Sequence, residues 1–118
     1  MSRKEEAMNK NGFEAWLVLK NNGRTRHVQD VISRALRINR DFGDLDAAYE
    51  ADQLAGYIAR LTYSTEDEHN RRPAPVELTF NIDRKDPLYF KKIHRGLSSL
   101  RNAVKLYRDY KNTKKGRA

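Results

Sequence analysis

Hydrophobic side chains recur every three or four residues in the segment Pro87–Lys111, and this spacing predicts the main helix of the chain. At about 100° per residue they form one stripe that faces a core. Asp86 followed by Pro87 is typical of a helix start, as an N-cap with proline in the first turn. The stripe consists of Phe90, Ile93, Leu97, Leu100, Val104 and Tyr107.

The opposite face of this helix carries only cations and small hydrogen-bonding groups, since no acidic residue occurs from Pro87 to Arg108. An exposed helix face usually mixes both signs, because opposite charges four residues apart support the helix. A face of one sign therefore predicts a polyanionic partner, most simply nucleic acid. The predicted contact residues are Lys91, His94, Arg95, Ser98, Arg101, Asn102 and Lys105.

A second amphipathic helix is predicted from Arg26 to Phe42, with Thr25 as its N-cap. Its reverse face adds a second basic group to the predicted nucleic-acid contacts. Asp30 and Asp41 can pair with neighbouring arginines and neutralise part of this group. Its apolar face holds Val28, Val31, Ile32, Ala35, Leu36, Ile38 and Phe42, and its basic residues are Arg26, Arg34, Arg37 and Arg40.

Shorter helices are predicted elsewhere. Phe13, Trp16 and Leu17 share one side of a helix that follows Asn11-Gly12 and ends at Asn21-Asn22-Gly23. Trp16 can stack on a base, but a single Trp at helical spacing beside two apolar residues is more typical of a core. The apolar residues of Asp44–Ser64 do not share one stripe. They predict a short helix over about Asp46–Ala51 and a second one capped by Asp52 and running to about Tyr63.

The segment 65–86 is expected to be an insertion before the main helix. Thr65–Pro75 is polar and predicts an exposed loop. Val76–Ile82 alternates apolar and polar residues, which is the periodicity of a strand. One strand cannot satisfy its own backbone groups, so three arrangements are open. The segment pairs with part of residues 65–75, pairs with a second copy in a homodimer, or lies over the helices without forming a strand.

The predicted fold class is mainly α, a small single-domain bundle of four to five helices with one short β-like insertion before the last helix. Residues 1–11 are expected to form a flexible start, residues 12–111 the helical domain, and residues 112–118 a basic disordered tail.

Charge is segregated along the chain, whose net charge is +8. Residues 1–41 hold nine basic and five acidic residues, residues 42–69 hold one and seven, and residues 70–118 hold fourteen and four. An acidic middle and a strongly basic end predict oriented binding rather than solubility alone.

Catalysis, metal binding and membrane insertion find little support in the sequence. His27, His69 and His94 lack metal-ligand spacing, and no catalytic motif occurs. We therefore expect no enzyme, no cofactor and no metal. With no cysteine and no long apolar run, the protein is expected to be cytoplasmic. An acidic cluster remains as an alternative set of metal ligands or catalytic carboxylates, although helix N-termini favour such residues too; it comprises Asp44, Asp46, Glu50 and Asp52.

Four segments, taken in order, resemble the helical core-binding (SAM-like) domain of tyrosine recombinases and phage integrases, versions of which also precede restriction-type nuclease domains. They cover about Phe13–Tyr110 and read FEAWL, GRTRHVQDVISRALRI, DLDAAYEADQLAGYIARLTYS and FKKIHRGLSSLRNAVKLYRDY. The resemblance implies that helix faces clasp duplex DNA and that the catalytic domain is a separate segment. The insertion 65–86 is longer than in that family, and the small-residue turn that usually joins the helices is missing.

Two functions of different class follow. The first is a non-enzymatic module that binds nucleic acid, with duplex DNA favoured over RNA because few aromatic residues alternate with the basic ones. The second is a protein-interaction or dimerisation module, whose basic face meets an acidic protein partner and whose Val76–Ile82 segment pairs two copies.

Overall fold

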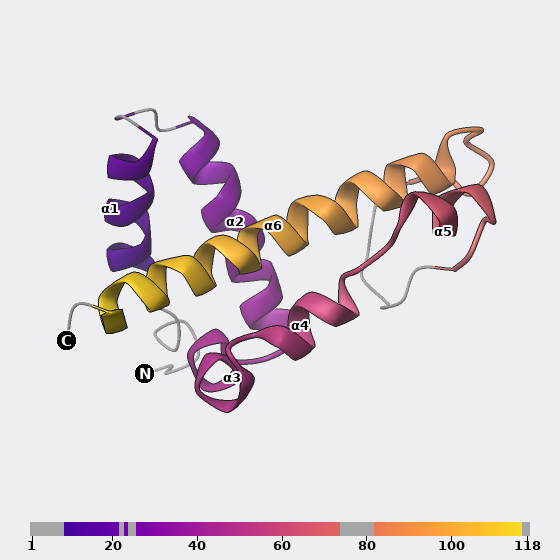
Figure 1. The fold of residues 1–118 in the computed structure, drawn as a ribbon. Coiled ribbons are helices and arrows are strands. Elements are labelled where there is room, and N and C mark those ends of the chain that lie inside the picture. Colours follow the sequence, from indigo (N-terminus) through magenta and orange to yellow (C-terminus); the bar gives the residue numbers. More distant parts are fainter. Residues whose placement is uncertain (1–8, 22, 24–25, 74–81, 117–118) are drawn as a thin grey trace.

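The computed structural model describes residues 9–21, 23, 26–73 and 82–116, and this part of the chain is helical without strands (Figure 1). The longest helix has 28 residues. At 1.5 Å per residue it is about 42 Å long, close to the 48 Å length of the whole molecule. The helices are α1 (Lys10–Lys20), α2 (Arg26–Asp41), α3 (Leu45–Asp52), α4 (Ala55–Arg60), α5 (Thr65–His69) and α6 (Tyr89–Gly116).

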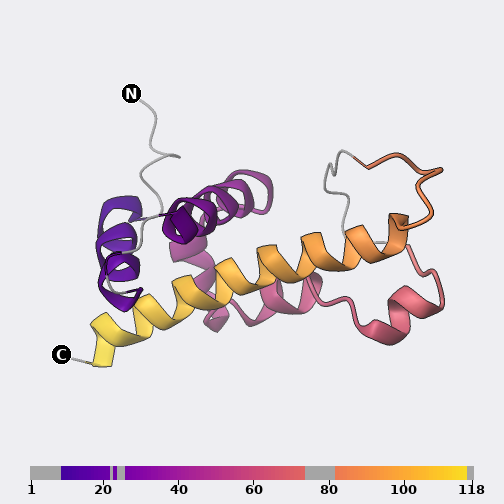
Figure 2. The ribbon, with the colours of Figure 1, turned by 90° about the horizontal axis from the view of Figure 1, so that it is seen from above.

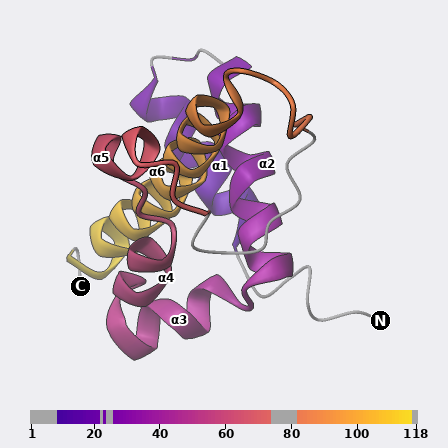
Figure 3. The same cartoon turned by 90° about the vertical axis from the view of Figure 1, so that its right-hand side faces the viewer.

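Helix α6 crosses the molecule and separates two groups of helices. Helices α1 and α2 lie on one side of it, and α3, α4 and α5 follow one another along another side (Figures 1 and 3). Seen from above, α1 and α2 stand together behind α6, and α5 lies beside its first turns (Figure 2). Helix α2 makes the most extensive contact with α6. The order of the helices therefore leaves one face of α6 uncovered by any other helix that the structure describes.

The apolar stripe predicted for α6 forms the centre of the core. Ile93, Leu97, Leu100, Val104 and Tyr107 are buried, as are Ala103 and Tyr110 beside them, whereas Phe90 near the helix start is half-buried. The stripe of α2 is buried against it: Val28, Val31, Ile32, Ala35 and Ile38. The prediction of a mainly α chain is confirmed.

Helix α1 begins earlier than predicted, because Asn11-Gly12 lies inside it. Asn9 is the N-cap, and its side chain accepts a hydrogen bond from the Gly12 amide. Gly12 also lets Tyr110 approach, since a Cβ there would lie 2.2 Å from the Tyr110 hydroxyl. Half-buried Trp16 packs against Phe13 and Tyr110, with ring centroids 6.2 and 5.9 Å away. The pair Asn11-Gly12 is therefore not a helix boundary, and Gly12 instead allows α1 and α6 to pack closely.

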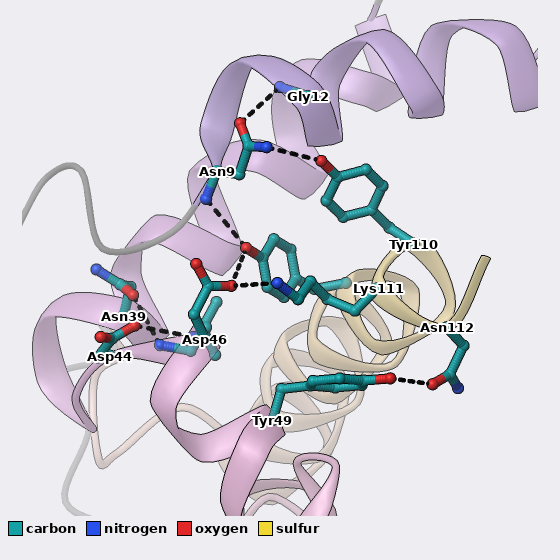
Figure 4. A network of polar contacts seen from close by, with 11 residues as sticks. Asn9, Gly12, Asn39, Asp44, Asp46, Tyr49, Tyr110, Lys111 and Asn112 are labelled. Atoms are coloured by element: carbon teal, nitrogen blue, oxygen red, sulfur yellow. Dashed lines mark hydrogen bonds and ion pairs between the residues drawn. The ribbon is translucent and has the colours of Figure 1, made fainter. Parts of the chain in front are cut away.

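Polar contacts tie α1, α3 and α6 together beside this aromatic cluster (Figure 4). The Asn9 amide donates to the buried Tyr107 hydroxyl, which donates to Asp46. Lys111 forms an ion pair with the same Asp46 carboxylate at 3.3 Å, and Tyr49 donates to Asn112. Burial, and then the bond to Asp46, raise the pKa of Tyr107 above its ordinary value.

The predicted division of Asp44–Ser64 into two helices is observed. Helix α3 ends at Asp52, and Gln53 and Leu54 then have left-handed φ angles of 57° and 68°. The Asp52 carboxylate accepts a hydrogen bond from the Gly56 amide in the first turn of α4. Leu54 is fully buried, and this burial offsets the steric cost of the turn.

The insertion differs from the prediction. Thr65–His69 is the single-turn helix α5 instead of a loop, because Ser64 and Asp67 form a reciprocal capping box. The bond from the Ser64 amide lowers the pKa of the Asp67 carboxyl. The β-like segment is not seen: residues 76–81 lie outside the described part of the chain, and Ile82 is irregular and packs against the core. Helix α6 begins at Tyr89 and continues past Lys111 to Gly116, into the predicted tail.

Candidate nucleic-acid interface

The uncovered face of α6 carries a straight row of polar side chains. Lys91, Arg95, Ser98, Asn102 and Lys105 follow one another at steps of four and three residues, so they line up opposite the buried stripe. We call them the outer row. It spans about 21 Å along the helix axis. Four of its side chains are exposed, and Ser98 is half-buried.

The three cations of the outer row make no ion pair with any residue that the structure describes. Lys92, one position along, shows the contrast. Its ammonium lies 2.5 Å from the Asp86 carboxylate, and this contact lowers the pKa of Asp86. The charges of Lys91, Arg95 and Lys105 therefore remain available to an external anion.

A second row of α6 faces the layer formed by α3, α4 and α5. His94, Arg101 and Arg108 recur every seven residues and form this flank row. His94 Nδ1 lies 2.8 Å from the Glu68 Oε1 atom of α5, and its ring packs edge-on against Tyr63. Arg101 is half-buried. Of the predicted contacts on α6, His94 is thus already bound by an acid, while Arg101 stands at the border of the exposed face.

Arg108, which the sequence did not single out as a contact, lies in a groove between α6 and the turn that joins α3 to α4. The groove has a volume of about 580 Å³ and mixed charge. The sequence holds no local signal for this groove, because Glu50 and Asp52 reach Arg108 only through the packing of α3 beside α6. Its lining residues are Glu50, Ala51, Asp52, Gln53, Ala55, Arg108, Asp109 and Asn112.

Three of the four residues of the acidic cluster, Asp44, Asp46 and Asp52, have structural partners. Asp44 is the N-cap of α3, and Asp46 accepts the Tyr107 hydroxyl. Asp52 accepts the Gly56 amide in the first turn of α4, although the N-cap of α4 is Leu54 and not Asp52 as predicted. Within residues 9–21, 23, 26–73 and 82–116, no group of three His, Cys, Asp or Glu side chains is arranged to hold a metal ion. The described carboxylates are therefore not arranged as a metal site.

The basic residues of α2 are partly neutralised, as the sequence indicated. Arg40 lies 3.0 Å and Arg37 lies 3.8 Å from the Asp41 carboxylate. The hydrogen bond and charge of Asp41 raise the pKa of Arg40. Arg26 is exposed and Arg34 is half-buried. This helix therefore offers less free positive charge than its sequence implies.

The basic surfaces of α2 and α6 do not form one face. The two helices pack with their apolar stripes toward each other, and on each helix the basic residues lie opposite the stripe. Their basic faces must then point away from one another. The eleven predicted contacts thus fall into three groups, which are the outer row, the flank row members His94 and Arg101, and the α2 arginines.

Among the helices that the structure describes, none is both long and apolar enough to span a membrane. Comparison of the chain with protein-family models, with curated proteins and with solved structures finds no match.

Proposed function

We propose that this protein is a non-enzymatic nucleic-acid-binding module that holds duplex DNA against the outer row of α6. The observation that carries the proposal is the set of three exposed cations, Lys91, Arg95 and Lys105, which share one straight face and have no acidic partner in the described residues. Phosphate groups are the natural counter-charges for such a row, and each contact releases condensed counterions from the DNA.

A duplex suits this surface better than a single strand. The outer row lies on a continuous helix, and an α-helix fits the major groove of B-DNA. Single-strand binding relies on exposed aromatic rings that stack on bases. The aromatic residues of α6 are not free for this role, since Tyr107 and Tyr110 are buried and Tyr89 and Phe90 are half-buried.

The resemblance to core-binding domains of tyrosine recombinases gives a biological setting for the proposal. The order of α1, α2, the α3–α4 pair and α6 is compatible with that family's helical domain. On this interpretation the chain clasps DNA for a recombinase or restriction-type nuclease domain that is a separate segment. In this proposal the outer row of α6 makes the phosphate contacts, whereas the sequence predicted such contacts from basic residues on two helices.

An electrophoretic mobility-shift titration in rising salt tests the proposal. We expect binding to unrelated duplexes, with a slope of log K against log salt of about −3 for three phosphate contacts. Absence of binding to any duplex at low salt would contradict DNA binding. A stable dimer by light scattering would in that case favour the alternative, a protein-interaction module that pairs through Val76–Ile82.

Substitution of Glu68 by glutamine is expected to tighten DNA binding about two- to threefold. The change replaces the carboxylate that lies 2.8 Å from His94 Nδ1 by a neutral amide. It thus removes a negative charge beside the outer row, which otherwise repels phosphate and offsets any positive charge on His94. Glu66→Gln is the matched control, because Glu66 is exposed on the same short helix and its side chain forms no hydrogen bond or ion pair with a described residue. Equal effects of the two variants in the mobility-shift titration would show that the His94 contact is irrelevant to binding.

A further inference from the structure

We infer that the outer row also reads the DNA sequence, with Asn102 as the residue that recognises an adenine edge in the major groove. This inference rests on the proposed function and deepens it from phosphate attraction to base recognition. It starts from the order of side chains along the row. Cations stand toward both ends, at Lys91 and Arg95 and at Lys105, and the neutral groups Ser98 and Asn102 stand between them.

The order of cations and neutral side chains along the outer row matches the arrangement of phosphates and base edges in the major groove of DNA. Arg95 and Lys105 are ten residues apart, which corresponds to about 15 Å along the axis. The major groove is about 12 Å wide and has a phosphate backbone on either side. A helix that lies within the groove, with its axis inclined to the two backbones, places its end cations near the phosphates and its central side chains over the base edges. Ser98 and Asn102 occupy that central stretch.

The hydrogen-bonding groups of these two residues have no partner within the part of the chain that the structure describes. The hydroxyls of Thr62 and Thr113 bond back to the carbonyl four residues earlier, but neither Ser98 nor Asn102 has a side-chain hydrogen bond to any described residue. The other asparagine in the described part of α6, Asn112, accepts a bond from Tyr49. Asn102 is thus exposed, and its amide has no partner among the described residues.

The position of Asn102 also has a cost for the fold. Asparagine is less favourable than alanine inside a helix, because its short amide competes with the backbone for hydrogen bonds. Asn102 is far from either helix end, and it caps nothing in the described structure. Its amide does suit an external ligand, since Nδ2 can donate to adenine N7 while Oδ1 accepts from adenine N6, the bidentate contact that asparagine commonly makes in the major groove.

Selection from a library of random duplexes, at constant low salt, tests the inference. The intact chain is expected to enrich sites with a fixed adenine at one position. Asn102→Ala should lose the preference at that position by about tenfold or more while its affinity for unselected duplex stays within about twofold. Its melting temperature should be unchanged or raised, which excludes misfolding as the cause. Asn11→Ala, an exposed asparagine in α1, should behave as the unaltered chain.

The possible results separate the inference from the proposed function. Two results would overturn base reading by Asn102. In the first, the unaltered chain enriches a site, but Asn102→Ala has the same preference at every position of it. In the second, the unaltered chain binds duplex clearly but enriches no site. Both results would leave phosphate binding by the outer row in place. Failure to retain any duplex would overturn the proposed function and, with it, the inference.

Discussion

Reversal of two charges on the outer row, Arg95→Glu with Lys105→Glu, is expected to weaken duplex binding by about 100-fold or more at low salt. Each change removes one phosphate contact and places a carboxylate where a phosphate would lie. The slope of log K against log salt should also fall in magnitude by about two. Both side chains are exposed and have no partner in the described residues, so the fold and its melting temperature should be retained.

A matched variant separates the site from net charge. Lys10→Glu with Lys85→Glu also lowers the net charge from +8 to +4, and both lysines are exposed and lie off the outer row. We expect it to weaken binding much less and to keep most of the salt slope. Equal losses in the two variants, measured by mobility shift with circular dichroism as the check on folding, would show that the protein attracts DNA only through its overall charge.

The core of this fold was largely predictable from local patterns. The apolar residues of α6 recur every three or four positions, which is the period of an α-helix and not of a strand. The members of this stripe from Ile93 to Tyr107 are buried as expected. The split of α3 from α4 was also predictable, because the apolar residues on either side of Asp52 lie at incompatible angles. Periodicity within one segment determines which face is apolar, and the apolar face then has to be buried.

The composition of the candidate site was less predictable, because it depends on how distant segments pack. His94 and Glu68 are 26 residues apart, and their contact exists only once α5 lies beside the start of α6. The basic faces of α2 and α6 diverge because their apolar stripes face each other, a relation that neither helix shows alone. A local signal for α5 did exist, since Ser64 followed three residues later by Asp67 is the spacing of a capping box.

The packing also places acidic and basic side chains on different sides of the molecule. The acidic middle of the chain forms α3 to α5, along one side of α6, where its carboxylates serve caps and hold His94. A polyanion is repelled from that side and attracted to the adjacent outer row. The proposed interface therefore depends on the acids as well as the cations, because the acids restrict the side from which DNA approaches.

Loss of the Tyr107 hydroxyl in Tyr107→Phe is expected to destabilise the fold by about 2–3 kcal/mol, as measured by urea denaturation. The hydroxyl accepts the Asn9 amide and donates to Asp46. Its removal leaves the part-buried Asn9 amide without this acceptor and leaves Lys111 as the described partner of the Asp46 carboxylate. The loss of two hydrogen bonds, one of them to a charged group, accounts for a cost of this size. In a domain of this size the melting temperature should fall by about 10 °C.

Tyr89→Phe is the control, because it removes the same atom from a half-buried tyrosine whose hydroxyl bonds to no described residue. Equal stability of the two variants would show that the network of Asn9, Tyr107 and Asp46 adds nothing to the free energy of unfolding.

The dependence of stability on alkaline pH gives a second measurement of the Tyr107 environment. Burial raises the pKa of Tyr107 in the folded state, so the unfolded chain loses this proton first, near pH 10. The stability linked to Tyr107 is thus present below about pH 10 and is lost as the pH rises further. Tyr107→Phe should lose less stability than the unaltered protein over that range, since the other tyrosines titrate in both.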